Sequence, residues 1–116
     1  MFTIDGKLKP EEVLAAFRAA AQATTDALPD ALARCKTEQE KQHVLAIRDA
    51  CQLAYLRALA GTLKHTGPLF DQVANELKTT ADEVVAKIKK VKKAIEAINL
   101  FTDVFKLAGS LSLAFV

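Results

Sequence analysis

The residues best suited to chemistry in this chain are two cysteines and two histidines: Cys35, His43, Cys51 and His65. Four such ligands would be enough by number for a tetrahedral zinc ion. Structural zinc sites usually draw their ligands from close pairs such as Cys-x-x-Cys, whereas successive members of this set are eight, eight and fourteen residues apart. The spacing therefore predicts no metal site, and Cys51 is better interpreted as a small core residue.

The sequence motifs that could indicate a catalytic site are either incomplete or absent. Glu40-x-x-His43 has the spacing of half the ligand set of a di-iron helical bundle, but the chain contains no second Glu-x-x-His. The four glycines form neither G-x-G-x-x-G nor G-K-[ST], the motifs that cradle phosphate at the start of a helix. Two histidines also leave few ways to place a base beside a nucleophile. We expect no catalytic residue, no cofactor and no enzymatic activity.

Charge is concentrated near the C-terminal end of the chain. Residues 87–116 hold six basic and two acidic side chains, whereas residues 1–86 hold ten basic and twelve acidic ones. The excess comes from a basic patch of five lysines: Lys87, Lys89, Lys90, Lys92 and Lys93. The simplest interpretation is the solvated face of an amphipathic helix. Because neither arginine nor an aromatic residue is interleaved with the lysines, we expect an acidic protein or anionic lipid as the partner, and no nucleic acid.

The elements that position these residues follow from composition. Hydrophobic residues make up 51% and charged residues 26% of the 116 residues, and 21 alanines against four glycines and three prolines favour helix. A chain of this length has room for one core. We therefore predict a single all-α domain over residues 1–116, folded as a small antiparallel bundle of four to five helices. No secretory leader or long uninterrupted apolar run is evident, so a cytoplasmic location with reduced thiols is expected.

Periodicity and capping residues predict where the helices begin and end. Pro29 ends the first helix, and Thr37 with Glu40 forms a capping box that opens the second. The same pattern at Thr80 and Glu83 predicts the start of a long final helix. The predicted helices cover residues 10–28, 38–65, 68–78 and 81–108, after an irregular lead-in over residues 1–9. Helices 38–65 and 81–108 are expected to form the principal pair.

The apolar face changes sides within the predicted helix 81–108. On a wheel of about 100° per residue, the seam from Val84 to Ile98 occupies one side, and the apolar residues from Leu100 onward lie about half a turn away. A straight helix would expose one of these faces to water. Three arrangements would resolve the conflict: a break near Ile98 to Thr102, a protein partner on the far side, or a lipid surface.

This second apolar face carries the functional prediction. Its dense apolar group is the predicted partner-binding set: Phe101, Val104, Phe105, Leu111 and Phe115. We predict a non-enzymatic protein–protein interaction module, of the adaptor, chaperone-like or inhibitor type, that forms a homodimer or holds another protein. The alternative is a membrane-surface-active protein whose basic and apolar C-terminal helix binds anionic lipid. The alternation of apolar and polar residues after Gly109 is compatible with an extended C-terminal tail.

Overall fold

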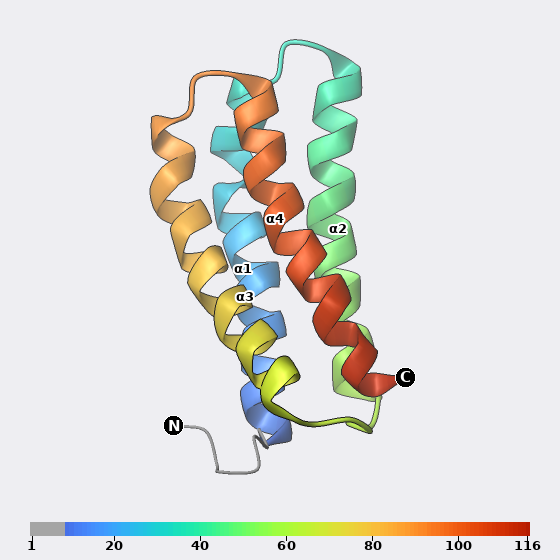
Figure 1. Ribbon diagram of the computed structural model, residues 1–116. Coiled ribbons are helices and arrows are strands. Elements are labelled where there is room, and N and C mark those ends of the chain that lie inside the picture. The colour runs from blue at the N-terminus through green and yellow to red at the C-terminus, as the bar shows by residue number, and fades with distance from the viewer. Residues whose placement is uncertain (1–8) are drawn as a thin grey trace.

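The computed structural model describes residues 9–116, and over this range the chain forms an antiparallel bundle of four long helices without strands (Figure 1). The helices are α1 (Pro10–Arg34), α2 (Glu38–Ala60), α3 (Pro68–Lys87) and α4 (Ala94–Ser112), with short 3-10 helices η1 (Ile88–Lys90) and η2 (Leu113–Phe115). The predicted all-α antiparallel bundle is confirmed. The predicted lead-in over residues 1–9 lies outside the described residues except for its last position.

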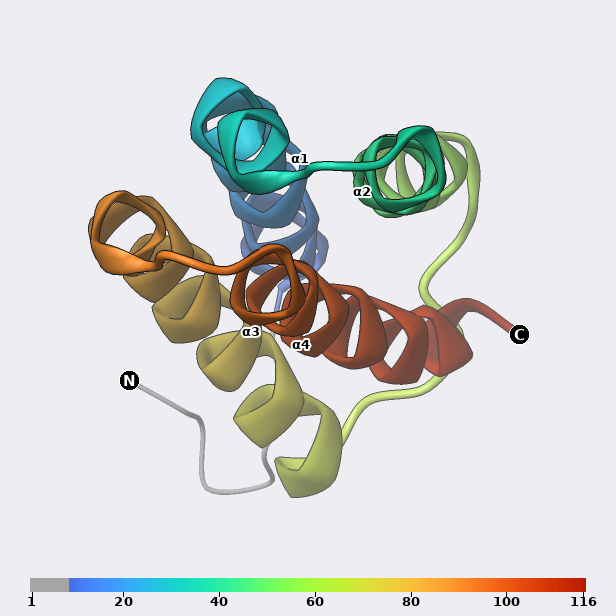
Figure 2. The same ribbon diagram turned by 90° about the horizontal axis from the view of Figure 1, so that it is seen from above.

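The four helices do not share the core equally. Viewed from above, α1 and α4 occupy the middle, and α2 and α3 lie on opposite sides of them (Figure 2). Each of the outer helices packs against both α1 and α4. The central pair is therefore α1 and α4, and not the expected pair of helices 38–65 and 81–108. As a consequence, α2 has neighbours on one side and meets solvent on the other.

Helix α1 can occupy the centre because its inward face is lined by small side chains. Its buried residues include Ala16, Ala20, Ala27 and Ala31, which recur at helical spacing and are almost without exposed surface. Phe17 supplies the bulk beside them and is fully buried. Alanine loses no side-chain entropy on burial and lets a neighbouring helix approach closely.

Two predicted helix ends are wrong in this half of the chain. The first helix runs through Pro29 to Arg34, because a proline removes only one internal hydrogen bond while buried Ala31 continues to bind the helix to the core. The second helix ends at Ala60 instead of residue 65. Its terminal cap is Gly61, whose backbone N–H donates to the Ala58 carbonyl oxygen at 3.3 Å. The predicted capping box that opens this helix, Thr37 with Glu40, is confirmed.

The second half of the chain is also divided differently from the prediction. The predicted helix 68–78 and the first turns of helix 81–108 form one continuous helix, α3, so Thr80 and Glu83 lie inside it and cap nothing. Glu83 instead accepts a hydrogen bond from Lys87 at 2.8 Å. Beyond residue 108, the chain stays helical through α4 and η2. The structure therefore has no extended C-terminal tail.

The break that resolves the two apolar faces lies between η1 and α4, earlier than the predicted site at Ile98 to Thr102. After η1 the backbone becomes extended at Val91, whose carbonyl oxygen accepts a hydrogen bond from Arg34 Nε at 2.6 Å. The side chain of Glu96 then accepts from the Lys93 backbone N–H at 3.1 Å and opens α4. The chain turns back here, so both apolar faces reach one core.

Two glycines should respond in opposite directions to alanine. Gly67 has a φ of 144°, a value that side chains rarely adopt, whereas Gly109 lies within α4 with open space where a Cβ would be. We predict that Gly67→Ala lowers the free energy of unfolding by about 1–3 kcal/mol. Gly109→Ala should raise it by about 0.5–1 kcal/mol, because glycine weakens a helix interior. Urea denaturation followed by circular dichroism measures both, and equal effects of the two substitutions would contradict the assignment.

Candidate functional site

The predicted partner-binding residues are divided between the core and the surface. Phe101, Val104 and Leu111 are 0% exposed. They lie on the buried face of α4, so these three side chains are part of the core and no partner can reach them in the folded chain. Phe105 on α4, at 43% exposed, and the half-buried Phe115 in η2 remain accessible. Of the predicted partner-binding residues, only Phe105 and Phe115 are therefore accessible to a partner.

The basic patch surrounds the turn between α3 and α4. All five of its lysines are exposed, on the last residue of α3, in η1 and in the connection to α4. Lys87 is paired with Glu83. The patch therefore covers one end of the bundle and does not border the apolar residues at the C-terminal end of α4 (Figure 1). The predicted combination of a basic and an apolar surface on one helix is thus separated along the length of the bundle.

The residues considered for chemistry are dispersed. Across residues 9–116, no three of the His, Cys, Asp and Glu side chains gather in a way that could hold a metal ion. His43 is exposed on α2, and His65 donates from Nε2 to the Val116 carbonyl oxygen at 2.8 Å. Burial raises the pKa of the Cys51 thiol to about 11, against a smaller opposing effect of a hydrogen bond with Thr24. Such a thiol is a poor nucleophile at neutral pH.

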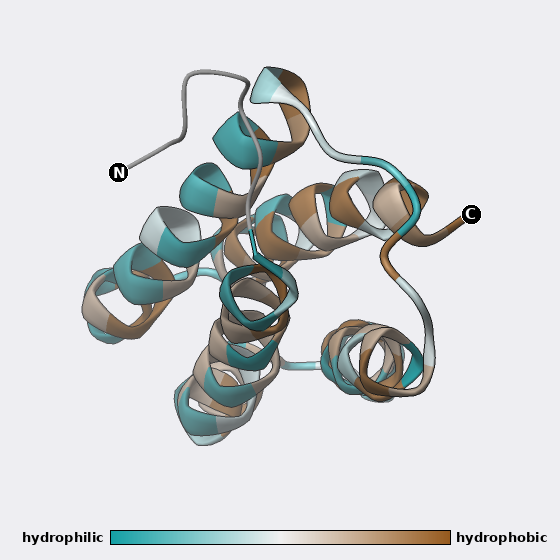
Figure 3. Ribbon diagram, turned by 90° about the horizontal axis from the view of Figure 1, so that it is seen from below, coloured by the Kyte–Doolittle hydropathy of each residue, from teal (hydrophilic) through white to brown (hydrophobic). Residues whose placement is uncertain are grey.

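Helix α4 is unusually apolar along its whole length. Figure 3 shows hydrophobic colours continuing along α4 to the C-terminal end of the chain, whereas α3 turns hydrophilic residues outward. The helical stretch Ala94–Phe115 is long and apolar enough to cross a membrane by length and composition alone. The central helix of a bundle can have the same length and composition, and the inward face of α4 lies in the core.

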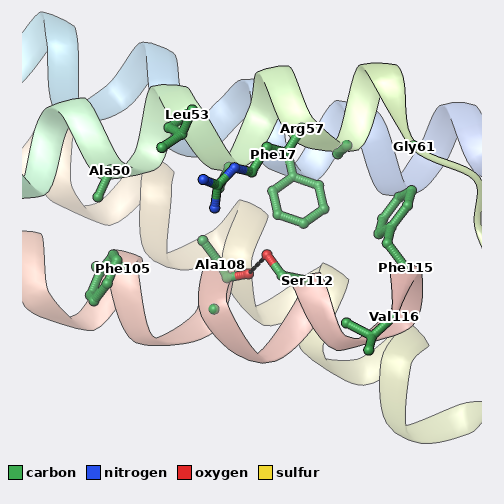
Figure 4. Close-up of a pocket in the computed structure, with 13 residues that line it drawn as sticks. Phe17, Ala50, Leu53, Arg57, Gly61, Phe105, Ala108, Ser112, Phe115 and Val116 are labelled. Carbon is green, nitrogen blue, oxygen red and sulfur yellow. Dashed lines mark hydrogen bonds between the residues drawn. The ribbon is translucent and has the colours of Figure 1, made fainter.

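A groove lies between the C-terminal halves of α2 and α4 (Figure 4). We call it the α2–α4 groove, and it has a volume of about 480 Å³. Its lining residues are Phe17, Ala50, Leu53, Ala54, Arg57, Ala58, Gly61, Phe105, Ala108, Gly109, Ser112, Phe115 and Val116. Arg57 is the single charged residue among them. A site of this size and composition has the character of an apolar binding pocket.

Small residues keep the α2–α4 groove open. On α2, alanines at positions 50, 54 and 58 and then Gly61 recur every three or four residues, so they share one side of the helix. Across from them α4 presents Ala108, Gly109 and Ser112. The inner end of the groove is closed by Phe17 and Phe115, whose rings meet edge to face with centroids 5.9 Å apart.

Beside the groove, the outer side of α2 carries a second apolar feature, which we call the leucine stripe. Leu53, Leu56 and Leu59 are 45%, 58% and 50% exposed. They follow one another at steps of three, so each touches the next along the helix surface. The sequence analysis did not predict this surface, because helix 38–65 was expected to belong to the principal pair. In the structure α2 lies at the side of the bundle, so these leucines remain exposed.

Truncation of two phenylalanines on α4 should separate the buried from the exposed part of the predicted partner-binding set. We predict that Phe101→Ala lowers the free energy of unfolding by about 3–5 kcal/mol, because it leaves a cavity in the core. Phe105→Ala should cost about 1 kcal/mol or less, since much of the ring already meets water. Chemical denaturation gives both values, and similar losses for the two variants would place both rings in the same environment.

The buried Cys51 thiol should also make stability depend on pH. Because its pKa is raised from an ordinary value of 9.0 to about 11, the folded chain retains a proton that the unfolded chain loses between these values. The free energy of unfolding should therefore fall as pH rises through this range, by up to about 1.4 kcal/mol per pH unit. Cys51→Ala lacks this contribution, so the difference between wild type and variant should shrink from pH 8 to pH 10.5. A constant difference would contradict the prediction.

Comparison with known proteins provides no assignment: no family model, no curated protein and no solved structure matches this chain. The features that could carry a function are therefore those of the molecule itself. They are the α2–α4 groove, the leucine stripe and the basic patch at the opposite end of the bundle. The first two are adjacent on α2, and both are apolar.

Proposed function

We propose that the protein is a non-enzymatic helical interaction module that associates with a second copy of itself through the leucine stripe. The observation that carries this proposal is the exposure of three leucines spaced three residues apart on α2, which no other helix within residues 9–116 covers. Contiguous apolar surface of this kind on a small protein commonly marks a site of protein–protein contact. A reducing compartment, the cytoplasm, is proposed with it because both cysteines are free thiols.

A two-fold axis suits the spacing of the leucine stripe. If two α2 helices pack antiparallel with the axis at Leu56, then Leu56 meets its own equivalent and Leu53 meets Leu59 of the second copy. The same patch then serves both subunits, as a symmetric dimer requires. Helix-on-helix packing of this type brings the axes to about 8–10 Å from one another.

The size of the leucine stripe favours weak association. Each leucine is about half covered already, so burial of the remainder contributes about 1 kcal/mol, or about 6 kcal/mol for six side chains. Association itself costs at least about 4 kcal/mol in lost translational and rotational freedom. The balance is at most about 2 kcal/mol, so the leucines alone predict a dimer that forms only at millimolar or higher concentration and dissociates on dilution.

Binding to anionic lipid is the second proposal, and the exposed lysines at one end of the bundle support it. Each basic side chain near such a surface contributes about 1 kcal/mol. Insertion of α4 would first require its buried residues to leave the core, so contact through the basic patch is the step we propose. Co-sedimentation with vesicles that contain phosphatidylserine tests it, and binding that persists after the five lysines are replaced by glutamine would contradict it.

The self-association is tested by Leu56→Glu. We expect the wild-type mass in light scattering to rise above 12.6 kDa as concentration increases. Leu56→Glu should keep the chain monomeric at the same concentrations, because it places a charge at the centre of the stripe, next to its own equivalent. The exposed fraction of Leu56 means that the substitution should change the free energy of unfolding by less than about 1 kcal/mol.

Ile95→Glu is the matched control. Ile95 is 57% exposed, close to the 58% of Leu56, and it lies in the first turn of α4 at the other end of the bundle. This variant should self-associate as the wild type does. A wild-type chain that remains monomeric at every concentration, or loss of association in both variants, would overturn the proposed interface.

A further inference from the structure

The α2–α4 groove has the dimensions of a site for an extended small molecule. Along α2 it reaches from Ala50 to Gly61, which is about 16 Å at the rise of an α-helix. This length accommodates a single extended chain of about ten carbon atoms. Volumes of about 300–1,000 Å³ are usual for small-molecule sites.

The walls of the groove select against polar ligands. Phenylalanine rings at positions 17, 105 and 115 and the side chain of Leu53 are its larger lining groups. Its one hydroxyl, on Ser112, already donates to the Ala108 carbonyl oxygen at 2.9 Å. A sugar or a nucleotide would leave most of its own polar groups without a partner in such a groove, at a cost for each. An aliphatic chain has no polar groups that would be left without a partner.

One charged side chain, that of Arg57, interrupts this apolar lining. Figure 4 shows the Arg57 side chain extending from α2 toward α4, with its guanidinium between Leu53 and Ala108. Arg57 makes no hydrogen bond or ion pair with any of residues 9–116. Arg57 is exposed, and its guanidinium can bind a carboxylate through two parallel hydrogen bonds. The arginine therefore supplies the complement to one negative charge.

From these observations we infer that the α2–α4 groove binds a linear amphiphile with one carboxylate, of the medium-chain fatty acid class. Its alkyl chain lies along the small residues of α2 and α4, and its carboxylate pairs with Arg57. Leu53 borders both the groove and the leucine stripe, whereas Leu56 and Leu59 do not line the groove. This inference goes beyond the proposed self-association and does not depend on it.

Decanoate is the probe, and titration followed by amide NMR shifts is the measurement. We expect saturable binding of one decanoate per chain, with the largest shifts at Gly61 and Gly109, which line the groove. Arg57→Gln should weaken decanoate binding about tenfold, the loss of one charge-assisted hydrogen bond. The same variant should change the affinity for decanol, which has no charge, by less than about twofold.

Gly109→Leu fills the groove from α4. A Cβ at this position meets nothing within 4 Å, so the variant should fold, and circular dichroism checks this. It should weaken the binding of both decanoate and decanol by at least about tenfold, because the side chain occupies the volume that the alkyl chain needs. Should this variant not fold, the comparison of decanoate with decanol in Arg57→Gln decides the matter alone.

Two further variants complete the test. Arg18→Gln removes an exposed arginine that lines a different hollow between α1 and α2, and it should bind decanoate as the wild type does. Leu56→Glu should also retain decanoate binding, which separates the groove from the self-association. The inference is overturned if decanoate binding does not saturate, if the shifts lie away from the groove, or if Arg57→Gln weakens decanoate and decanol equally.

Discussion

The reversal of the chain between α3 and α4 is the constraint on which the rest of the structure depends. A break in a helix leaves backbone donors and acceptors without partners, and each must be satisfied if it is not to cost free energy. Here Arg34, at the end of α1, donates to the Val91 carbonyl oxygen, and Glu96 accepts from the backbone N–H groups of the connection. The first of these bonds joins distant parts of the chain. It fixes the direction in which α4 returns and hence which side chains of α4 become core.

Local sequence patterns predicted the helical class and the starts of three helices correctly, at Pro10, Glu38 and Pro68, but not which of two equal capping patterns would open a helix. Thr37 with Glu40 and Thr80 with Glu83 are the same motif, yet only the first opens a helix. Around the second, Leu77, Ala81 and Val84 are all buried and hold one continuous helix against the bundle. Packing therefore outweighed a capping signal worth about 1 kcal/mol. The start of α4 was not predicted because Lys93, the residue before it, is not a usual capping residue. The cap bond comes instead from the Glu96 side chain, which accepts from the Lys93 backbone N–H.

The candidate site shows a similar division. The wheel placed two apolar faces on one predicted helix, but the structure divides those residues between α3 and α4, and the exposed surface depends on where the chain turns. The regular spacing of small residues along α2 can be recognised in the sequence. The small residues of α4 that line the other side of the groove lie some fifty residues further on, and only the fold brings the two sets together. The position of α2 at the side of the bundle, which leaves the leucine stripe uncovered, is likewise a property of all four helices together.

The ring contact between Phe17 and Phe115 has a consequence for how the chain acquires its surface. It joins the second turn of α1 to the last residues of the chain, so the entropy of closing nearly the longest possible loop must be offset before it forms. The amides of Lys64 and His65 bond the Ala114 carbonyl oxygen beside it. The α2–α4 groove is therefore complete only when α1 and η2 have docked, and a partly folded intermediate that retains most of the helices lacks it.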